Sequence, residues 1–194
     1  WNTIRLSLLN LAWGFWVPIV FALLLNEVRV MPYKRVTQTF AYLPYFVSSV
    51  IVVSILITLT SNFGVINRVV RALGREPIAF FQDSKYFDGM YVITSIWRTF
   101  GYSSILYLAG IAGVDPELYA AVEVDGGNRI HKMWHVTLPS LLPTIIVLLV
   151  LACGRILSSN TEMVLLMYNA SIYDRADIIG TYVYRTGLVN ARYS

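Results

Sequence analysis

Long uncharged stretches alternate with short polar segments along the chain. No charged side chain occurs at residues 6–26 or at residues 36–67. About 20 consecutive apolar residues are enough for a helix to cross the hydrocarbon core of a bilayer. We therefore predict membrane-spanning helices at residues 6–26 and at about residues 39–59. Two further apolar stretches predict helices at residues 89–111 and 138–157.

The apolar stretches predict helices rather than strands. In lipid, backbone groups have to be paired within a helix or around a closed barrel, and the alternating segments typical of a barrel are missing from the sequence. The predicted fold class is therefore an all-α membrane protein, a polytopic helical bundle. Gly101, Ser103 and Ser104 are small residues of the kind that let helices pack closely in lipid. Residues 158–194 contain only short apolar runs, which predict one or two short helices at the outer surface.

Composition agrees with a membrane protein. Of the 194 residues, 57% are hydrophobic and 13% are charged, whereas about 25% are charged in an average soluble domain. The net charge of +4 is spread along the chain without a Lys/Arg-rich run, so we interpret it as a complement to the membrane surface and expect no nucleic-acid binding. Cys153 is the one cysteine in the sequence, and its apolar neighbours predict a buried thiol.

Basic residues give the orientation of the chain. Arg29, Lys34 and Arg35 lie in the first connection between predicted spans, and Arg129 and Lys132 lie in the third. Four others lie in the longer second connection: Arg68, Arg71, Arg75 and Lys85. Counted per residue of connection, the positive-inside rule favours a cytoplasmic location for the first and third connections.

A polar loop at residues 115–138 carries clear helix signals. The letters DPE at residues 115–117 give an N-cap, a proline at the first helical position and an acid in the first turn. The letters DGG at residues 125–127 predict the end of this helix, because glycine readily takes a positive φ. A second short helix is expected from Asn128, with one face made of Ile130, Met133, Trp134 and Thr137 or Leu138. Such a unit lacks a nucleophile-base pair but suits docking into a partner's groove.

The same loop matches a known signature. Residues 118–121 (LYAA), 124–127 (VDGG) and 134–139 (WHVTLP) follow the order Glu-Ala-Ala, Asp-Gly-Ala, an aromatic residue, and Ile or Val-x-Leu-Pro. In this respect the chain resembles the permease subunits of binding-protein-dependent ABC importers. The family's glutamate falls on Ala120 and its second alanine on Val122, while a glutamate stands at Glu123. The stretches ALLLNEVR, TFAYLPYFVS and VVRALGREPIAFF resemble the carbohydrate-uptake branch, especially permeases for oligosaccharides and polysaccharide fragments.

The resemblance implies an architecture and a mechanism. It implies one type I ABC importer transmembrane domain over residues 1–194, with a cytoplasmic coupling loop at residues 115–138, an outer-surface segment at residues 158–194, and further helices before Trp1 and after Ser194. It implies a multi-pass protein of the bacterial plasma membrane that works by alternating access. The residues that it places at the ATPase-coupling interface are Ala120, Ala121, Glu123, Asp125, Gly126, Leu138 and Pro139.

The resemblance also implies partners. They are a second permease subunit, cytoplasmic ATPase subunits, an extracytoplasmic solute-binding protein, and a sugar as the transported molecule. The sequence holds no Gly-x-x-x-x-Gly-Lys-Ser/Thr motif for binding ATP phosphates. We therefore expect a transport subunit rather than an enzyme, without a cofactor of its own, and with ATP and magnesium bound by the partner ATPase.

A few side chains are candidates for the substrate path. Arg98 and Arg155 lie in predicted spans, where a charge is costly and normally faces the bundle interior or water, and Trp97 stands beside Arg98. Each arginine either contacts sugar hydroxyls or carboxylates or holds a structural partner. His131 and His135 share a helical spacing, but no Asp, Glu or Cys completes a metal site around them, so we expect positions in an interface instead.

Other classes of function stay open at this point. An ABC permease for another solute, such as an amino acid or a polyamine, would share the same coupling loop. A membrane enzyme would need a constellation of carboxylate, His or Ser side chains within a span, and an ATP-independent carrier would show membrane-buried acids or internal repeats. Neither pattern is evident in the sequence.

Overall fold

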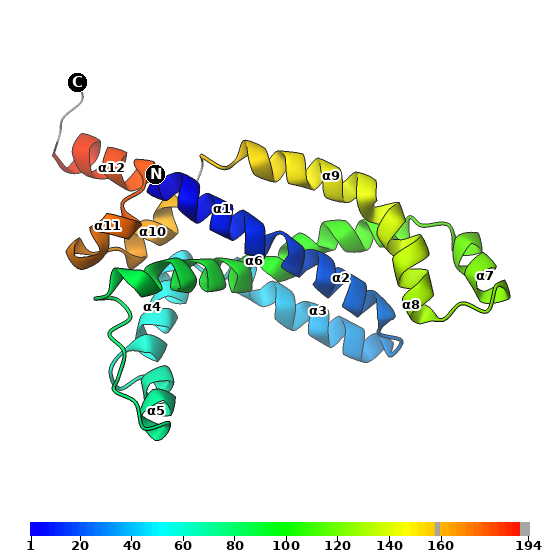
Figure 1. Ribbon diagram of the computed structural model, residues 1–194, viewed down its shortest axis with the longest axis horizontal. Helices are drawn as coiled ribbons and strands as arrows, with labels where there is room; N and C mark the ends of the chain where they lie inside the picture. The colour runs from blue at the N-terminus through cyan, green and yellow to red at the C-terminus, as the bar shows by residue number, and fades with distance from the viewer. Residues whose placement is uncertain (158–159, 191–194) are drawn as a thin grey trace. The chain divides into compact units, whose positions relative to one another are not determined.

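The computed structural model describes residues 1–157 and 160–190 (Figure 1). Over these residues the chain forms helices and turns without a strand, so the predicted all-α fold is confirmed. The helices are α1 (Asn2–Gly14), α2 (Trp16–Glu27), α3 (Met31–Phe46), α4 (Ser49–Thr60), α5 (Val65–Ala72), α6 (Phe87–Ala112), α7 (Pro116–Val124), α8 (Arg129–Lys132), α9 (Leu138–Gly154), α10 (Thr161–Met167), α11 (Tyr173–Ala176) and α12 (Ile179–Val183). Wider π-type turns occupy Met133–Thr137 and Tyr184–Val189.

Three helical stretches in the described part of the chain are long and apolar enough to cross a membrane: Asn2–Glu27, Ser49–Ala72 and Arg129–Gly154. A fourth stretch, Ser84–Ala112 together with Pro116–Val124, is bent by 69° between its two helices. The predictions at residues 6–26 and 89–111 fall within helical stretches, the first with a one-residue interruption at Phe15. The helix predicted to end at residue 157 ends at Gly154.

The single helix predicted at about residues 39–59 is wrong. The structure ends α3 at Phe46 and begins α4 at Ser49, and Ser48 has an extended ψ of 141° between them. The Ser48 hydroxyl accepts a hydrogen bond from the Val50 N–H at 3.3 Å, so it acts as the N-cap of α4. The apolar pattern hid this break because the interruption needs only one capping serine among apolar neighbours.

One compact unit comprises Leu11–Tyr45 and Ile96–Gly154. Its core brings together side chains from α2, the second half of α6 and α9: Ile19, Ala22, Tyr107, Ile111, Leu141 and Ile145. Small residues set how closely its helices approach. A Cβ at Gly101 would overlap the carbonyl oxygen of Ala41, and a Cβ at Gly110 would lie 2.8 Å from a methyl group of Leu141. The predicted role of Gly101 in close helix packing is therefore confirmed.

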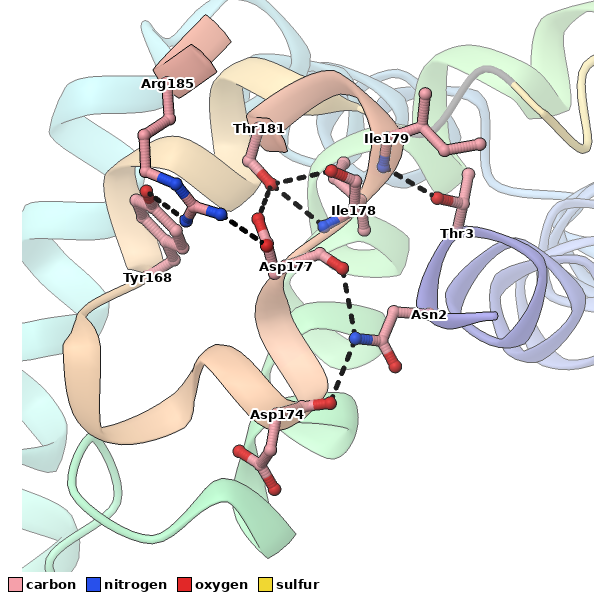
Figure 2. A network of polar contacts seen from close by, with 9 residues as sticks. All are labelled: Asn2, Thr3, Tyr168, Asp174, Asp177, Ile178, Ile179, Thr181 and Arg185. Atoms are coloured by element: carbon pink, nitrogen blue, oxygen red, sulfur yellow. Dashed lines mark hydrogen bonds and ion pairs between the residues drawn. The ribbon is translucent and has the colours of Figure 1, made fainter. Parts of the chain in front are cut away.

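The other compact unit comprises Trp1–Asn10, Phe46–Ser95 and Arg155–Ser194. Its buried apolar side chains include Phe87, which is fully buried, and three residues of α10, namely Met163, Val164 and Met167. Figure 2 shows how polar groups then connect the start of α1 to the C-terminal segment. The Asn2 amide donates to the carbonyl oxygens of Asp174 and Asp177, each at 3.0 Å.

The C-terminal segment is more helical than predicted. In place of one or two short helices, the described residues 160–190 form α10, α11 and α12, with additional helical turns between and after them. Each of these helices is seven residues or shorter, so its apolar residues are too few to give a readable period. Residues 158–159 and 191–194 of the predicted outer-surface segment lie outside the described residues.

The thiol of Cys153 was expected to be buried, and that prediction is wrong. Cys153 is exposed on α9. The reason is that apolar neighbours indicate burial only where water is the solvent, whereas a membrane helix presents apolar residues on its outer face as well.

Candidate functional site

The first helix of the polar loop, α7, starts as the sequence predicts. The Asp115 carboxylate accepts a hydrogen bond from the Glu117 N–H at 2.9 Å, and the Asp115 carbonyl accepts from the Leu118 N–H at 3.2 Å. Pro116 occupies the first helical position, where no N–H is needed. An Asp N-cap contributes about 1 kcal/mol to the stability of a helix. The start of α7 is thereby fixed without contacts to distant residues.

The end of α7 is fixed in the same local way. Gly126 has a φ of +74°, and its N–H donates to the Glu123 carbonyl at 3.0 Å while the Gly127 N–H donates to the Val122 carbonyl at 2.8 Å. This pair of bonds is the Schellman arrangement that closes many helices with a glycine. At Gly127 the constraint is space, because a Cβ there would overlap a methyl group of Val122. The two glycines are therefore required for different physical reasons.

The second short helix is not separate, which corrects the prediction. α8 begins at Asn128, whose side-chain oxygen accepts from the His131 N–H at 3.0 Å while the Asn128 N–H donates to His131 Nδ1 at 3.2 Å. From there the helix continues through the wide turn at Met133–Thr137 into α9, as Figure 1 shows. The turn falls just before Pro139, which has no N–H for a helical bond, and a widened turn is a common way for a helix to accommodate that loss.

Two contacts tie α7 to the helix that follows it. Lys132 forms an ion pair with Glu123, and the Tyr119 hydroxyl lies 3.1 Å from the Thr137 hydroxyl. α7 lies beyond the end of the long apolar helix α6, and there the hydrogen bond from the Lys132 ammonium lowers the pKa of the Glu123 carboxyl. These contacts hold the two arms of the loop at a fixed angle.

α7 is exposed on most of its surface. Only Tyr119 and Val122 are partly buried, and Val124 keeps 87% of its surface accessible. On the second arm, the predicted apolar face is exposed at Ile130 and Trp134 but buried at Thr137, so it enters the protein only where it approaches α9. A capped, rigid helix that shows apolar side chains on several sides has the shape of a knob for a complementary groove.

The structure brings together most of the residues predicted at the coupling interface. Ala120, Ala121, Glu123, Asp125 and Gly126 are all exposed on α7 and on the turn that ends it. The two remaining residues lie elsewhere. Leu138 packs against the apolar core of its unit, and Pro139 is exposed one residue further along α9.

Sequence reasoning missed the side chains that brace the loop. Tyr119 and Thr137 are 18 residues apart and meet only because α7 folds back toward α9. The close approach of Gly127 to Val122 was also missed, although a signal existed. The signature has an alanine at both of these positions, whereas this chain pairs a larger residue with a smaller one. The two departures compensate each other in volume.

The candidate substrate-path residues fall in different places. Trp97 and Arg98 lie on α6, with Trp97 45% exposed and Arg98 half-buried and engaged in contacts within the chain. Arg155 follows the last residue of α9 and is exposed in a turn, so the expectation that it lies within an apolar helix is wrong. Trp97 and Arg98 belong to one compact unit and Arg155 to the other.

The loop offers no metal site in the part of the chain that the structure describes. His131 is committed to capping α8, and Nδ1 of His135 lies 3.0 Å from the His131 carbonyl oxygen. Over the described ranges, no group of three or more His, Cys, Asp and Glu side chains lies close enough together to hold a metal ion.

Known proteins similar to this chain include components of bacterial transport systems. Residues 14–172 match the family model described as the binding-protein-dependent transport system inner membrane component. Protein LplB of Bacillus subtilis (strain 168) is 47% identical over 194 residues, which are 100% of this chain and 61% of LplB. The polygalacturonan/rhamnogalacturonan transport system permease protein YteP of the same organism is 45% identical over 100% of this chain and 60% of its own length.

Solved structures agree with this result. A chain from the crystal structure of a bacterial ABC transporter involved in the import of the acidic polysaccharide alginate matches with a TM-score of 0.95 and 41% sequence identity, covering 99% of this chain and 68% of that one. A chain from the same kind of transporter in complex with an alginate pentasaccharide-bound periplasmic protein gives a TM-score of 0.94. In length, this chain corresponds to about 60% of each of the sequence relatives LplB and YteP.

Proposed function

Because this chain belongs to the binding-protein-dependent transport system inner membrane components, we propose that it forms part of the permease subunit of an ATP-driven importer for oligosaccharides or polysaccharide fragments. The family describes an inner-membrane component of a transport system, and we propose that the chain acts in transport rather than as an enzyme. In this proposal separate cytoplasmic ATPase subunits bind ATP and magnesium, and the permease converts their movement into alternating access to the solute.

The observation that carries the proposal is the exposed, locally capped helix α7. A helix that transmits force between two proteins has to keep its own shape while it is pushed. Asp115 fixes the first turn of α7 and the Gly126 turn fixes its end, while Tyr119 and Glu123 connect it to the second arm of the loop. We place the exposed face around Ala120 and Ala121 in a groove of the ATPase subunit, so that α7 moves together with α8 and α9.

The proposed solute is an acidic oligosaccharide. Among the relatives, YteP is named for polygalacturonan and rhamnogalacturonan, and the solved transporter imports alginate, an acidic polysaccharide. Arg98 and Arg155 are the side chains that we propose to contact the carboxylates of such a sugar, with Trp97 offering an aromatic face to the sugar ring. The net charge of +4 is compatible with an anionic solute.

The remaining partners follow from the same proposal. A second permease subunit shares the path, because one chain contributes only part of the wall around the solute. A solute-binding protein delivers the sugar on the outer side. The alginate transporter was solved together with a sugar-bound periplasmic protein, which supports this arrangement for the present chain.

A cysteine cross-link tests the docking of α7. The full-length protein carries Cys153→Ser and Ala121→Cys and is expressed with its ATPase subunit, which carries one cysteine in the groove of its helical domain. We expect a cross-linked product whose yield changes when ATP is added. The matched control is Ser140→Cys, because Ser140 is also exposed but lies on α9 beyond the loop. A product of equal yield from both variants, or from neither, would contradict the docking proposal.

Reconstitution tests the solute. The assembled transporter is placed in vesicles with its binding protein, and ATP hydrolysis is measured with oligogalacturonate and with a neutral oligosaccharide of similar length. We expect stimulation by the acidic sugar and a lower apparent affinity in Arg98→Gln. If the neutral sugar stimulates equally well and Arg98→Gln and Arg155→Gln both leave uptake unchanged, the acidic-sugar proposal fails while the coupling proposal stands.

A further inference from the structure

A polar cavity lies beside α7 at the end of α6. Its volume is about 340 Å³, and all its lining residues belong to the same compact unit. Asn26 near the end of α2, Lys34 and Gln38 on α3, and Tyr119 on α7 supply its polar groups. The remaining wall is apolar and comes from the last turns of α6. The proposed transport function assigns no role to this cavity.

Two of these polar side chains have no partner over residues 1–157 and 160–190. The Lys34 ammonium has neither an ion pair nor a hydrogen bond there, and the Asn26 amide is equally unpaired, although both residues are half-buried. The polar atoms of Lys34 and Asn26 are not sealed off from solvent. Among the described residues, the one side-chain atom that is both fully buried and unpaired is Nε of Arg5. A half-buried ammonium beside amide donors has the chemistry of a site for a small anion.

The depth of the cavity points to the membrane surface. Asn26 is the penultimate residue of the apolar stretch Asn2–Glu27, and Ala112, which also lines the cavity, is the last residue of α6. Where apolar helices end, lipid headgroups begin. Arg29 is exposed in the connection between α2 and α3, and Arg35 is exposed in the second turn of α3. Basic groups at the membrane surface attract anionic lipid.

We propose that this cavity binds the phosphate group of an anionic phospholipid. A phosphodiester carries one negative charge, which matches the single ammonium of Lys34. The amides of Asn26 and Gln38 donate to its oxygens. The Tyr119 hydroxyl lines the same cavity and lies 3.1 Å from the Thr137 hydroxyl, which itself donates to the Lys132 carbonyl. A bound headgroup would bridge α3 and α7 and steady the coupling loop from the membrane side.

Lipid binding to defined variants tests the site, whichever solute is transported. The full-length protein is purified in detergent and titrated with a short-chain phosphatidylglycerol or phosphatidylcholine, and bound lipid is counted by native mass spectrometry. We expect Lys34→Gln to weaken phosphatidylglycerol binding about five- to tenfold. Asn26→Asp should weaken it at least as much, because a carboxylate there would pair with Lys34 and repel phosphate. Both variants should keep the melting temperature of the parent protein.

The matched control is Arg35→Gln, which removes the same charge from the next residue but leaves the cavity wall intact. We expect its lipid binding to stay within about twofold of the parent, as for one screened surface charge. An equal loss in Arg35→Gln and Lys34→Gln would overturn the site in favour of general surface attraction. Equal binding of phosphatidylcholine would overturn it as well. A third titration uses inorganic phosphate, and Lys34-dependent displacement of lipid at millimolar phosphate would assign the cavity to a free anion instead.

Discussion

The loop around α7 and the C-terminal segment at residues 160–190 are held in opposite ways. At both ends of α7, the hydrogen bonds join residues two to five positions apart, such as Asp115 with Glu117 and Gly127 with Val122. The C-terminal segment has local bonds too, such as that from Thr181 to Asp177, but the bonds that attach it to α1 join residues across almost the whole chain. Asn2 donates to the carbonyl oxygen of Asp177, 175 residues away, and Arg5 donates to that of Arg175, 170 residues away.

This difference predicts which region keeps its structure without contacts to distant parts of the chain. A local bond closes a short loop and costs little chain entropy, whereas a bond between distant residues forms only after the rest of the unit has brought them together. The two ends of α7 should therefore stay structured while their surroundings move, which is what the proposed coupling role would require. The C-terminal segment should lose its structure when its contacts with α1 are removed.

The largest expected effect comes from Arg5→Met. Arg5 donates to the Asp88 carboxylate at 2.9 Å and to the Arg175 carbonyl at 2.8 Å, and the Arg5 and Asp88 side chains are only 21% and 17% exposed. Removing one partner of a mostly buried pair costs about 2 to 4 kcal/mol of unfolding free energy. We expect faster proteolysis within residues 160–190 and a lower melting temperature, both measured on the full-length protein in detergent.

The control for Arg5→Met is Lys85→Met in the same unit. Lys85 pairs with Asp83 at the surface, and an exposed pair contributes little to stability, so no measurable change is expected. The contrast between the two regions breaks down if Arg5→Met also raises hydrogen exchange within α7, or if both variants lower the melting temperature equally.

The next largest effect is expected from Gly127→Ala. The added methyl group would overlap Val122, and such overpacking typically costs about 1 to 3 kcal/mol. The new methyl group would meet a methyl of the Val122 side chain first and the Val122 carbonyl oxygen second. Val122→Ala removes the first of these contacts and should therefore relieve much of the strain. We expect the double variant to protect α7 amides from exchange better than Gly127→Ala alone. Additive losses in the double variant would show that the two positions do not compensate each other.

A smaller effect is expected from Asp115→Ala. It removes the N-cap of α7 and should cost about 1 kcal/mol, expressed mainly as fraying of the first turn. Hydrogen exchange at Glu117 and Leu118 measures this directly. Asp115→Ser is the matched control, since serine also caps well and should preserve the protection. Fraying of equal extent in both variants would mean that charge, rather than the cap bond, fixes the helix start.

The smallest effect is expected from Glu123→Gln. Its ion pair with Lys132 leaves Glu123 largely in water, where charge pairs are weak. Because the folded-state pKa of Glu123 is lowered, the pair contributes at neutral pH, and its contribution is lost as the pH falls through that lowered pKa. We expect protection of the residues at the α7–α8 turn to decline slightly between pH 7 and pH 3 in the parent and to stay flat in Glu123→Gln. An equal decline in both would assign the pH effect to another group.

Much of the fold and of the coupling loop was predictable from sequence. Uncharged stretches located the apolar helices, and the DPE and DGG letters gave both ends of α7, because these signals act over a few residues. Short-range signals also had limits. The break at Ser48 left no trace in an apolar pattern, and the helix that follows Asn128, expected as a separate short helix, continues into α9.

The sequence by itself determined that this chain is an all-α membrane protein with a locally capped polar loop at residues 115–138, since hydropathy and capping depend on neighbouring residues. Only the tertiary structure decided what distant residues do. It placed Tyr119 against Thr137, brought Asn2 to Asp177, and gathered Asn26, Lys34 and Gln38 around one cavity. The physical reason is that these contacts depend on the angles at which helices pack, and those angles are set by whole surfaces of side chains rather than by any single stretch of sequence.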